Sequence, residues 1–272
     1  MQTGAPLHAS RTLKYGPSEA QEGDLYLPAA SRPPVVCLIH GGFWRMPYGR
    51  EELADVAKDI VSRGYAVWNI EYRRLGAPGG GWPGTLNDVA SAVDHLAKLA
   101  DEGLDLDLDQ VIVVGHSAGG HLALWVSARN KDTYFRASRV MPVAAAGLAA
   151  ISDLARTYEI YAGNGAVDEL LGGGPSDVPE RYSAASPIEL LPLGTKQLII
   201  HGVMDQALPI ALSRLYASTA LASGDSVDFV ELPDAGHMDY LDPNSEAHAT
   251  LCKWLAHVTR RENAGAPPKT GG

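Results

Sequence analysis

The hydrophobic positions of this chain fall into two patterns that alternate along the sequence. Short, mostly apolar runs occur at Val35–Ile39, Tyr65–Ile70 and Val111–Val114, as is typical of strands covered on both faces of a sheet. Between these runs, apolar residues recur every three or four positions, as on the buried face of a helix. Strands and helices that alternate in this way predict a mostly parallel sheet with helices on both faces.

The same patterns predict eight strands and five main helices. The strands are expected at Leu7–Tyr15, Leu25–Leu27, Val35–Ile39, Tyr65–Ile70, Val111–Val114, Met141–Leu148, Leu198–Ile200 and Val227–Leu232. The helices are expected at Leu53–Val61, Thr85–Ala97, His121–Arg129, Pro209–Ala222 and Ser245–Arg260. In such a sheet ligands bind at the carboxyl ends of the strands, so residues that directly follow strands are the candidates for chemistry.

One long segment breaks the alternating pattern. Residues 152–192 carry scattered glycines and short helical pieces, and so long a stretch without a clean period is unusual inside a compact domain. We interpret this segment as a small cap, inserted after the sixth strand over the active face. The chain is expected to form one α/β domain over residues 1–262, followed by a disordered Gly/Pro/Ala-rich tail at 263–272.

Composition narrows the classes of partner. Of the 272 residues, 46% are hydrophobic, which is enough for a large packed core, and the net charge is −10. An acidic chain is a poor partner for nucleic acid or for an anionic membrane surface, and it does not attract anionic substrates. A small neutral molecule is therefore the expected substrate, with neither nucleic acid nor membrane as a partner.

The remaining features of the sequence point to a cytoplasmic protein without cofactors. The two cysteines, Cys37 and Cys252, lie in apolar strand-like and helix-like runs, and we expect buried free thiols in a reducing compartment. The N-terminus shows no basic region followed by an apolar one, so no signal peptide is expected, and no apolar run is long enough to span a membrane. No metal-ligand spacing is found, and the sequence leaves open whether the chain forms a homodimer.

The stretch from Gly115 to Gly119 has the form Gly-x-Ser-x-Gly and directly follows the run at Val111–Val114. A strand, a sharp turn and a helix are the context in which this motif forms a nucleophile elbow. Such a turn projects the Oγ of Ser117 above the end of the sheet, and the two glycines leave room for the close approach of strand and helix. The alternative is a serine that only caps the helix; we favour Ser117 as a nucleophile.

A serine nucleophile needs a base and an acid that orients the base. In this kind of sheet the expected order along the chain is serine, acid, histidine. Asp205 follows the strand Leu198–Ile200, and His237 follows the last strand, so we predict Asp205 as the acid and His237 as the base. Asp153 is the second candidate for the acid, and Asp234 is too close to His237 in sequence to be favoured.

The oxyanion of an acyl-transfer reaction needs two or more N–H donors that point at one position. We predict the backbone N–H of Ala118, at the start of the elbow helix, together with those of Gly42 and Phe43 in the loop after Ile39. Trp44, Trp82 and His116 are weaker candidates for the substrate pocket. Each tryptophan could equally be a packing residue, and His116, which precedes the nucleophile, either points away or lines the pocket. The other histidines are expected to be structural (His40, which holds the loop, His121 and His201) or to lie on the surface (His8, His95, His248 and His257).

These motifs resemble those of the α/β-hydrolase superfamily, in its esterase/lipase group with a His-Gly-Gly motif. His40-Gly-Gly-Phe-Trp44, Gly115-His-Ser-Ala-Gly119, Asp205 and Gly236-His237 stand in the family's order, and the resemblance covers about residues 15–254. The segment with Tyr15-Gly and Asp24-Leu-Tyr-Leu-Pro28 resembles the start of bacterial feruloyl/acetyl-xylan esterase-like and serine-type kynurenine formamidase-like members. The His-Gly-Gly-Phe-Trp motif also resembles the formamidase branch. Phe43 departs from the lipase pattern, which has a third glycine at this position.

The resemblance implies the α/β-hydrolase fold and a serine hydrolase that needs no metal or cofactor. We expect hydrolysis of a carboxylic ester of a small or medium neutral substrate, with an arylformamidase or amidase on the same triad as the alternative. A binding module that kept the fold but lost the chemistry usually lacks a triad member, and here all three are present. A peptidase of the prolyl oligopeptidase type is a further alternative, against which we count the lack of room in this chain for an accessory propeller domain.

Overall fold

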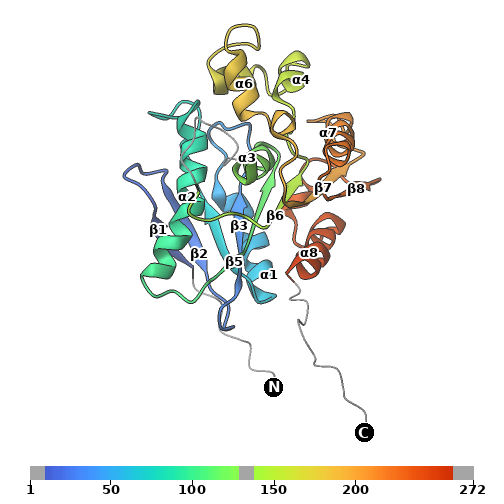
Figure 1. The fold of residues 1–272 in the computed structure, drawn as a ribbon. Coiled ribbons are helices and arrows are strands. Elements are labelled where there is room, and N and C mark those ends of the chain that lie inside the picture. The colour runs from blue at the N-terminus through green and yellow to red at the C-terminus, as the bar shows by residue number, and fades with distance from the viewer. Residues whose placement is uncertain (1–9, 129–137, 260–272) are drawn as a thin grey trace.

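The computed structural model describes residues 10–128 and 138–259 (Figure 1). Eight strands form a single sheet in the order β1-β2-β4-β3-β5-β6-β7-β8. The strands are β1 (Arg11–Lys14), β2 (Glu22–Tyr26), β3 (Pro34–Ile39), β4 (Ala66–Ile70), β5 (Asp107–His116), β6 (Ala144–Leu148), β7 (Lys196–Gly202) and β8 (Val227–Leu232). The helices that flank them are α1 (Ala54–Ser62), α2 (Gly84–Asp101), α3 (Ala118–Ala128), α7 (Ala211–Ala222) and α8 (Glu246–Val258).

The sheet is parallel except at one edge. The strands β1 and β2 pair antiparallel with each other, and β2 pairs antiparallel with β4. From β4 to β8 all neighbouring strands run parallel, so their carboxyl ends meet at the same edge. The predicted fold class, a mostly parallel eight-stranded α/β-hydrolase sheet with helices on both faces, is confirmed.

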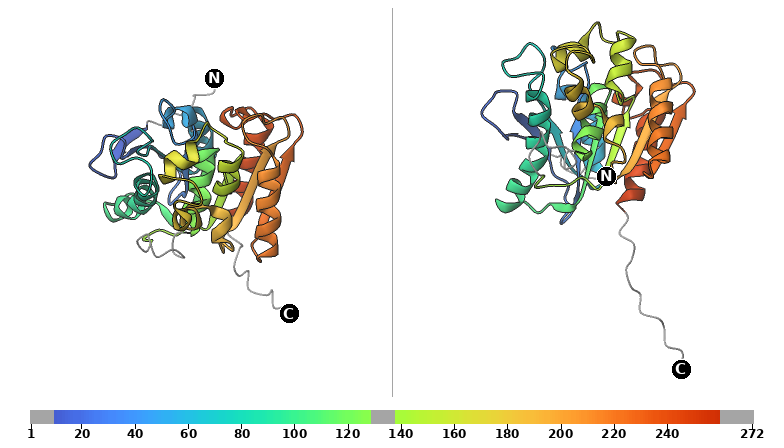
Figure 2. Two further views of the ribbon diagram at one scale, coloured as in Figure 1. Left: turned by 90° about the horizontal axis from the view of Figure 1, so that it is seen from above. Right: turned by 45° about the horizontal axis from the view of Figure 1, so that its top comes forward.

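Alternate residues of each strand enter two separate cores. In β3, Val35, Cys37 and Ile39 pack with α2, α3 and α7 on one face, whereas Val36 and Leu38 pack with α1 and α8 on the other. The views in Figures 1 and 2 show these helices on opposite sides of the sheet. Because side chains of a strand point to opposite faces, the apolar runs of the sequence have to be continuous to fill both cores.

The cap segment folds into short helices above the carboxyl ends of the strands. They are α4 (Leu154–Glu159), α5 (Ala166–Leu171), α6 (Pro179–Ala185) and the 3₁₀ turn η3 (Pro187–Leu190), at the top of Figure 1. Two buried ring N–H groups of α3 hold α6 in place. His121 Nε2 donates to Ala185 O at 2.9 Å, and Trp125 Nε1 donates to Ala184 O at 3.1 Å. The helix that follows Ser117 therefore also supports the cap.

Element boundaries differ from the prediction by a few residues. The sixth strand begins at Ala144 and not at Met141, since the side chains of Met141 and Val143 are exposed and leave the buried run. The 3₁₀ turn η1 (Arg50–Leu53) precedes α1. The predicted tail, the start of the first strand and the end of the helix predicted to reach Arg129 lie outside the described residues.

Two further expectations concern burial. Both cysteines, Cys37 and Cys252, are buried free thiols, as predicted. His95 and His248 were expected at the surface, and that expectation is wrong because both are buried, on α2 and α8. Within residues 10–128 and 138–259, none of the helices has the length and apolar character needed to cross a bilayer.

Candidate functional site

Ser117 occupies a strained turn between β5 and α3. Its φ of 55° lies in the left-handed region, which costs a residue other than glycine about 1–3 kcal/mol. Backbone hydrogen bonds on both sides fix the turn: Ser117 N–H donates to Leu148 O at 2.8 Å, and Ser117 O accepts from His121 N–H at 3.1 Å. This geometry places the serine at the carboxyl edge of the sheet.

The glycines of the motif permit the close approach that the turn requires. A Cβ on Gly115 would lie 2.0 Å from the carbonyl oxygen of Gly119. A Cβ on Gly119 would lie 2.1 Å from Ile39 O and 2.4 Å from His40 O. Strand β3 and helix α3 therefore touch through backbone atoms at Gly119, where no side chain can rotate away.

We expect Gly119→Ala to lower the free energy of unfolding by about 2–3 kcal/mol, because the new methyl group would push against two backbone carbonyls. Activity should fall as well, since the end of β3 leads directly into the loop beside Ser117. Chemical denaturation measures the loss. Gly64→Ala is the comparison, because φ there is 96° but nothing lies within 4 Å, so that only backbone strain of about 1 kcal/mol is expected. Equal losses in the two variants would contradict the steric argument.

Asp205 and His237 are brought together by the loops that follow β7 and β8. His237 Nδ1 donates to Asp205 Oδ2 at 2.7 Å, and the Asp205 side chain is fully buried. The other carboxylate oxygen, Oδ1, accepts from the N–H groups of Ala207 and Leu208 at 2.8 and 2.9 Å. The alternative acid, Asp153, caps α4 by accepting from the N–H of Arg156. The pairing expected for a base and its orienting acid is thus found at Asp205.

The carboxyl group of Asp205 is held in its ionised form. Burial by itself would raise its pKa, but hydrogen bonds from His201, His237 and the Leu208 N–H outweigh burial and lower the pKa well below its ordinary value. Asp205 therefore remains an acceptor for His237 throughout the neutral range. This fixes the proton on His237 Nδ1 and leaves Nε2 free to accept one.

His116 supports the backbone next to His237. Its Nε2 donates to His237 O at 2.8 Å, and the two rings lie 4.8 Å apart. Burial, with a smaller contribution from the neighbouring His237, lowers the pKa of His116 to about 3, so the ring is neutral. The expectation that His116 lines a substrate pocket is wrong in this structure, because the ring is buried and turned to the backbone.

The loop after β3 lies directly against the serine. A Cβ on Gly41 would be 3.1 Å from Ser117 Cβ and 2.9 Å from His116 O. Gly42 and Phe43 follow with φ values of 91° and 48°, an unusual left-handed pair. Among the described residues, none of the hydrogen bonds uses the N–H of Gly42, Phe43 or Ala118. The three predicted oxyanion donors thus stay available for a ligand.

His40 anchors this loop from below, as predicted. Its Nδ1 lies 2.9 Å from Gly41 O, and its Nε2 lies 2.8 Å from Glu71 Oε1. The Tyr72 ring stacks on His40 at 4.4 Å, and the Tyr72 hydroxyl donates to His40 O. All three side chains are buried, so the loop rests on a rigid polar support.

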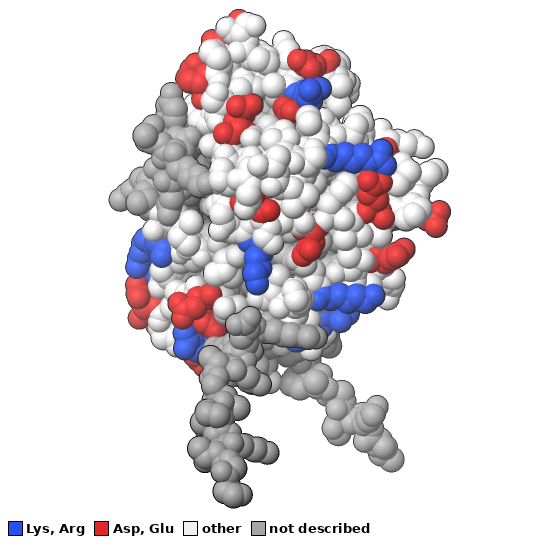
Figure 3. All heavy atoms as spheres, turned by 45° about the vertical axis from the view of Figure 1, so that its right-hand side comes forward, with Lys and Arg blue, Asp and Glu red and all other residues white. Residues whose placement is uncertain are grey.

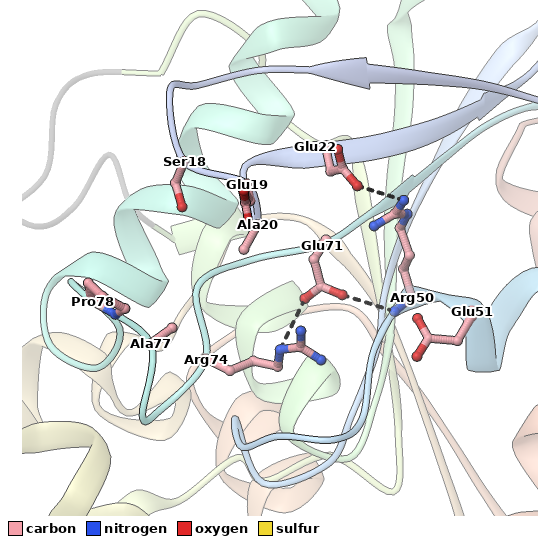
Figure 4. A pocket seen from close by; sticks show the side chains of 10 residues that line it. All are labelled: Ser18, Glu19, Ala20, Glu22, Arg50, Glu51, Glu71, Arg74, Ala77 and Pro78. Carbon is pink, nitrogen blue, oxygen red and sulfur yellow. Dashed lines mark hydrogen bonds and ion pairs between the residues drawn. The ribbon is translucent and has the colours of Figure 1, made fainter.

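Behind His40, the carboxylate of Glu71 borders a charged cavity of about 530 Å³. Figure 4 shows Glu71 between Arg50 and Arg74, with Glu22 paired to the guanidinium of Arg50. Burial would raise the pKa of Glu71, but His40, the Tyr72 N–H and Arg74 together lower it. Ser117 does not line this cavity, which we interpret as part of the loop's support.

The aromatic candidates for the substrate pocket take different positions. Trp44 is 0% exposed and packs edge-on against His121, so its assignment to the pocket is wrong. Trp82 is half-buried, and its backbone N–H donates to Leu170 O in the cap at 2.7 Å. Phe43 packs on the cap as well: a Cβ on Gly163 would lie 2.4 Å from Phe43 Cδ1. The cap and the loop after β3 are therefore in direct contact.

A cluster of metal-ligand residue types lies away from the serine, between α1 and α8. Asp59, His248 and Cys252 bring their ligand atoms within 4.8 Å of one another. However, Arg63 already pairs with Asp59 at 2.6 Å, and within the described part of the chain His248 Nδ1 has no hydrogen-bond partner. Histidines that bind metals almost always donate their second N–H to an acceptor. We therefore interpret this cluster as an ion-pair network.

Comparisons with known proteins agree with this architecture. The BD-FAE family model matches residues 24–219. Esterase LipQ of Mycobacterium tuberculosis is 27% identical over 76% of this chain and 50% of its own length, and Esterase LipC of the same organism is 28% identical over 87% and 61%. A kynurenine formamidase of Meyerozyma guilliermondii is 32% identical over 124 residues, 44% of this chain and 43% of its own. The chain thus spans only half to three fifths of the length of the two esterases.

Solved structures with the same fold cover nearly the whole chain. A truncated carbohydrate esterase from gut microbiota has a TM-score of 0.78, with 20% identity over 93% of this chain and 98% of its own. Esterase Est2 of Thermogutta terrifontis has a TM-score of 0.74, with 19% identity over 96% and 95%. At this level of identity the similarity establishes the fold.

Proposed function

The chain belongs to the BD-FAE family, within the esterase/lipase group of α/β-hydrolases, and from this premise we propose that it is a serine hydrolase that cleaves carboxylic esters through an acyl-enzyme. One observation carries the proposal. At the carboxyl edge of the sheet, the strained Ser117 adjoins a loop with free N–H groups, and the bonded pair of Asp205 and His237 follows neighbouring strands. This is the set of groups that acyl transfer to a serine requires.

In the first half of the reaction, Ser117 Oγ attacks the ester carbonyl carbon while His237 Nε2 takes the hydroxyl proton. The N–H groups of Gly42, Phe43 and Ala118 stabilise the negative charge on the carbonyl oxygen. The tetrahedral intermediate then collapses, the bond to the leaving oxygen breaks, and His237 returns the proton to the alkoxide. Asp205 stays ionised and stabilises the imidazolium.

The second half repeats these steps with water. His237 takes a proton from a water molecule, whose oxygen attacks the acyl carbon, and the same three N–H groups stabilise the second intermediate. Collapse breaks the bond to Ser117 Oγ, which recovers its proton from His237. The chemistry uses only protein groups and water.

The substrate we propose is a small or medium neutral ester. On the face drawn in Figure 3, acidic and basic side chains are interspersed, with several acidic ones at the top, where the cap lies. With a net charge of −10, the chain does not favour anionic substrates. The names of its relatives LipQ and LipC support ester hydrolysis. We further propose that neither nucleic acid nor a membrane surface is a partner.

A second candidate, arylformamidase activity on the same triad, rests on a separate observation. Kynurenine formamidases from a yeast and a fish match 44–45% of this chain at 29–32% identity. A formamide would place its carbonyl oxygen against the same N–H donors, and His237 would protonate an amine in place of an alkoxide.

A series of p-nitrophenyl esters from acetate to decanoate tests the proposal, with aryl formamides measured alongside. We expect turnover that is fastest for short acyl chains and falls with chain length. Ser117→Ala provides the background. Slow ester turnover with fast formamide cleavage would move the assignment to the second candidate, and activity that is unchanged in the Ser117→Ala variant would overturn the mechanism for both.

A further inference from the structure

Asp205 contacts a second imidazole besides His237. His201, at the end of β7, places its Nε2 3.2 Å from Asp205 Oδ2, the same oxygen that His237 contacts at 2.7 Å. The side chains of His201 and Asp205 are both fully buried. Since Oδ1 is occupied by two backbone N–H groups, His201 and His237 share the remaining oxygen.

The partners of His201 require a proton on its Nε2. Its Nε2 also lies 3.1 Å from Leu208 O, so this nitrogen faces only a carbonyl and a carboxylate and has to carry a proton. Its Nδ1 lies 2.7 Å from the hydroxyl of Ser213, a buried residue of α7 that can donate. The neutral Nε2–H tautomer therefore satisfies every polar atom of the ring.

We propose that His201 is a positioning residue for the hydrolysis, set in its donor tautomer by Ser213. This inference rests on the proposed function. By donating to Oδ2, neutral His201 holds the carboxylate in the orientation that His237 needs. The same N–H also partly neutralises the negative charge on Asp205 Oδ2, which would otherwise stabilise the His237 imidazolium more strongly.

The other polar groups around His201, Asp205 and His237 do not donate to Asp205 Oδ2 in place of His201. On the neighbouring strand β8, Glu231 is opposite His201 but is paired with Arg214 of α7. Tyr240 binds the Gly202 N–H with its hydroxyl oxygen, and His116 is neutral and donates to the backbone of His237. His201 is therefore the side chain that shares Oδ2 with His237.

Three variants separate donation from packing. His201→Leu removes the donor, His201→Gln can place an amide N–H near the former Nε2, and Ser213→Ala removes the group that sets the tautomer. Each is compared with the wild type for kcat, KM and the pH profile of kcat/KM on p-nitrophenyl acetate, after subtraction of the Ser117→Ala rate. Thermal unfolding checks that each variant is folded.

We expect His201→Leu to lower kcat about 10- to 100-fold, the loss associated with a hydrogen bond to a charged group, with little change in KM. The acid limb of its pH profile, which reports His237, should move to higher pH because Asp205 then stabilises the imidazolium more strongly. His201→Gln should keep the wild-type limb and most of kcat, and Ser213→Ala should lose less than His201→Leu.

Two outcomes would overturn the inference. One is a folded His201→Leu variant with wild-type kcat and pH profile, and the other is a His201→Gln variant that fails as badly as His201→Leu. Should His201→Leu not fold, His201→Gln and Ser213→Ala still test the inference. A shift of the acid limb of the pH profile in His201→Gln would mean that His201 acts as a cation and not as a neutral donor. If the wild type shows no turnover above Ser117→Ala, the proposed function fails, which is distinct from either result.

Discussion

Replacing Ser117 with alanine is expected to lower kcat for ester hydrolysis about 10⁶-fold, the size of effect seen when a serine hydrolase loses its nucleophile. The variant keeps the N–H groups of the loop and the pair of Asp205 and His237, but no oxygen remains to form the acyl-enzyme. Steady-state rates with p-nitrophenyl acetate measure the loss. The fold should persist, because alanine tolerates the turn at φ 55° about as well as serine does.

Ser127→Ala is the matched control for that experiment. Ser127 is a buried serine of the same helix, α3, and its hydroxyl donates to Ala123 O at 3.0 Å. We expect its loss to leave kcat unchanged. A fluorophosphonate should modify the wild type and Ser127→Ala once, on the peptide that contains Ser117, and should leave Ser117→Ala unmodified. Modification at another residue would contradict the assignment of the nucleophile.

The sequence could predict the sheet because its signals are local. The continuous apolar runs of β3, β4 and β5 reflect burial on both faces, and the Gly-x-Ser-x-Gly turn reflects a backbone contact that excludes a Cβ at Gly119. Chain order at the carboxyl ends of the strands then places the acid between Ser117 and His237, which both Asp153 and Asp205 satisfy. Each inference needs only residue type and position along the chain.

Local signals in the sequence did not predict for every side chain whether it is buried or where it points. Trp44 follows a motif of functional residues, but its ring is fully buried and packs edge-on against His121, and residue type alone does not reveal this. For His248 a signal did exist, because it precedes Leu251 and Cys252 by three and four positions on the buried face of α8. Helical spacing would have predicted its burial.

The shared oxygen of Asp205 is a feature that only tertiary structure reveals. His201 and Asp205 are four residues apart. This spacing alone does not show that His201 lies at the end of a strand, or that the loop after the strand brings Asp205 back to it. Ser213 comes from the following helix, and His237 from beyond the next strand. A sequence reading that assigns His201 a structural role is compatible with this arrangement, but it does not identify the group that His201 supports.

Replacing Asp205 with asparagine is expected to lower kcat about 10⁴-fold at neutral pH. Asp205 accepts two backbone N–H groups on Oδ1 and the N–H of His237 on Oδ2, and His201 Nε2 lies 3.2 Å from the same Oδ2. An amide has one oxygen, and its NH₂ group has to face donors at the other position. If the oxygen stays with the backbone N–H groups, the NH₂ group forces His237 into the tautomer with the proton on Nε2, which cannot accept the proton of Ser117.

The same variant should show a stability effect that depends on pH. Because the pKa of Asp205 is lowered in the folded chain, its ionised form contributes stability above the unfolded value of about 3.9, and that stability is lost as the pH falls toward the folded value. The difference in unfolding free energy between wild type and Asp205→Asn should therefore be largest near neutral pH and should shrink in acid. Asp153→Asn is the control, because Asp153 caps α4 and does not contact His237. A loss of kcat in Asp153→Asn as large as that in Asp205→Asn would reverse the assignment of the acid.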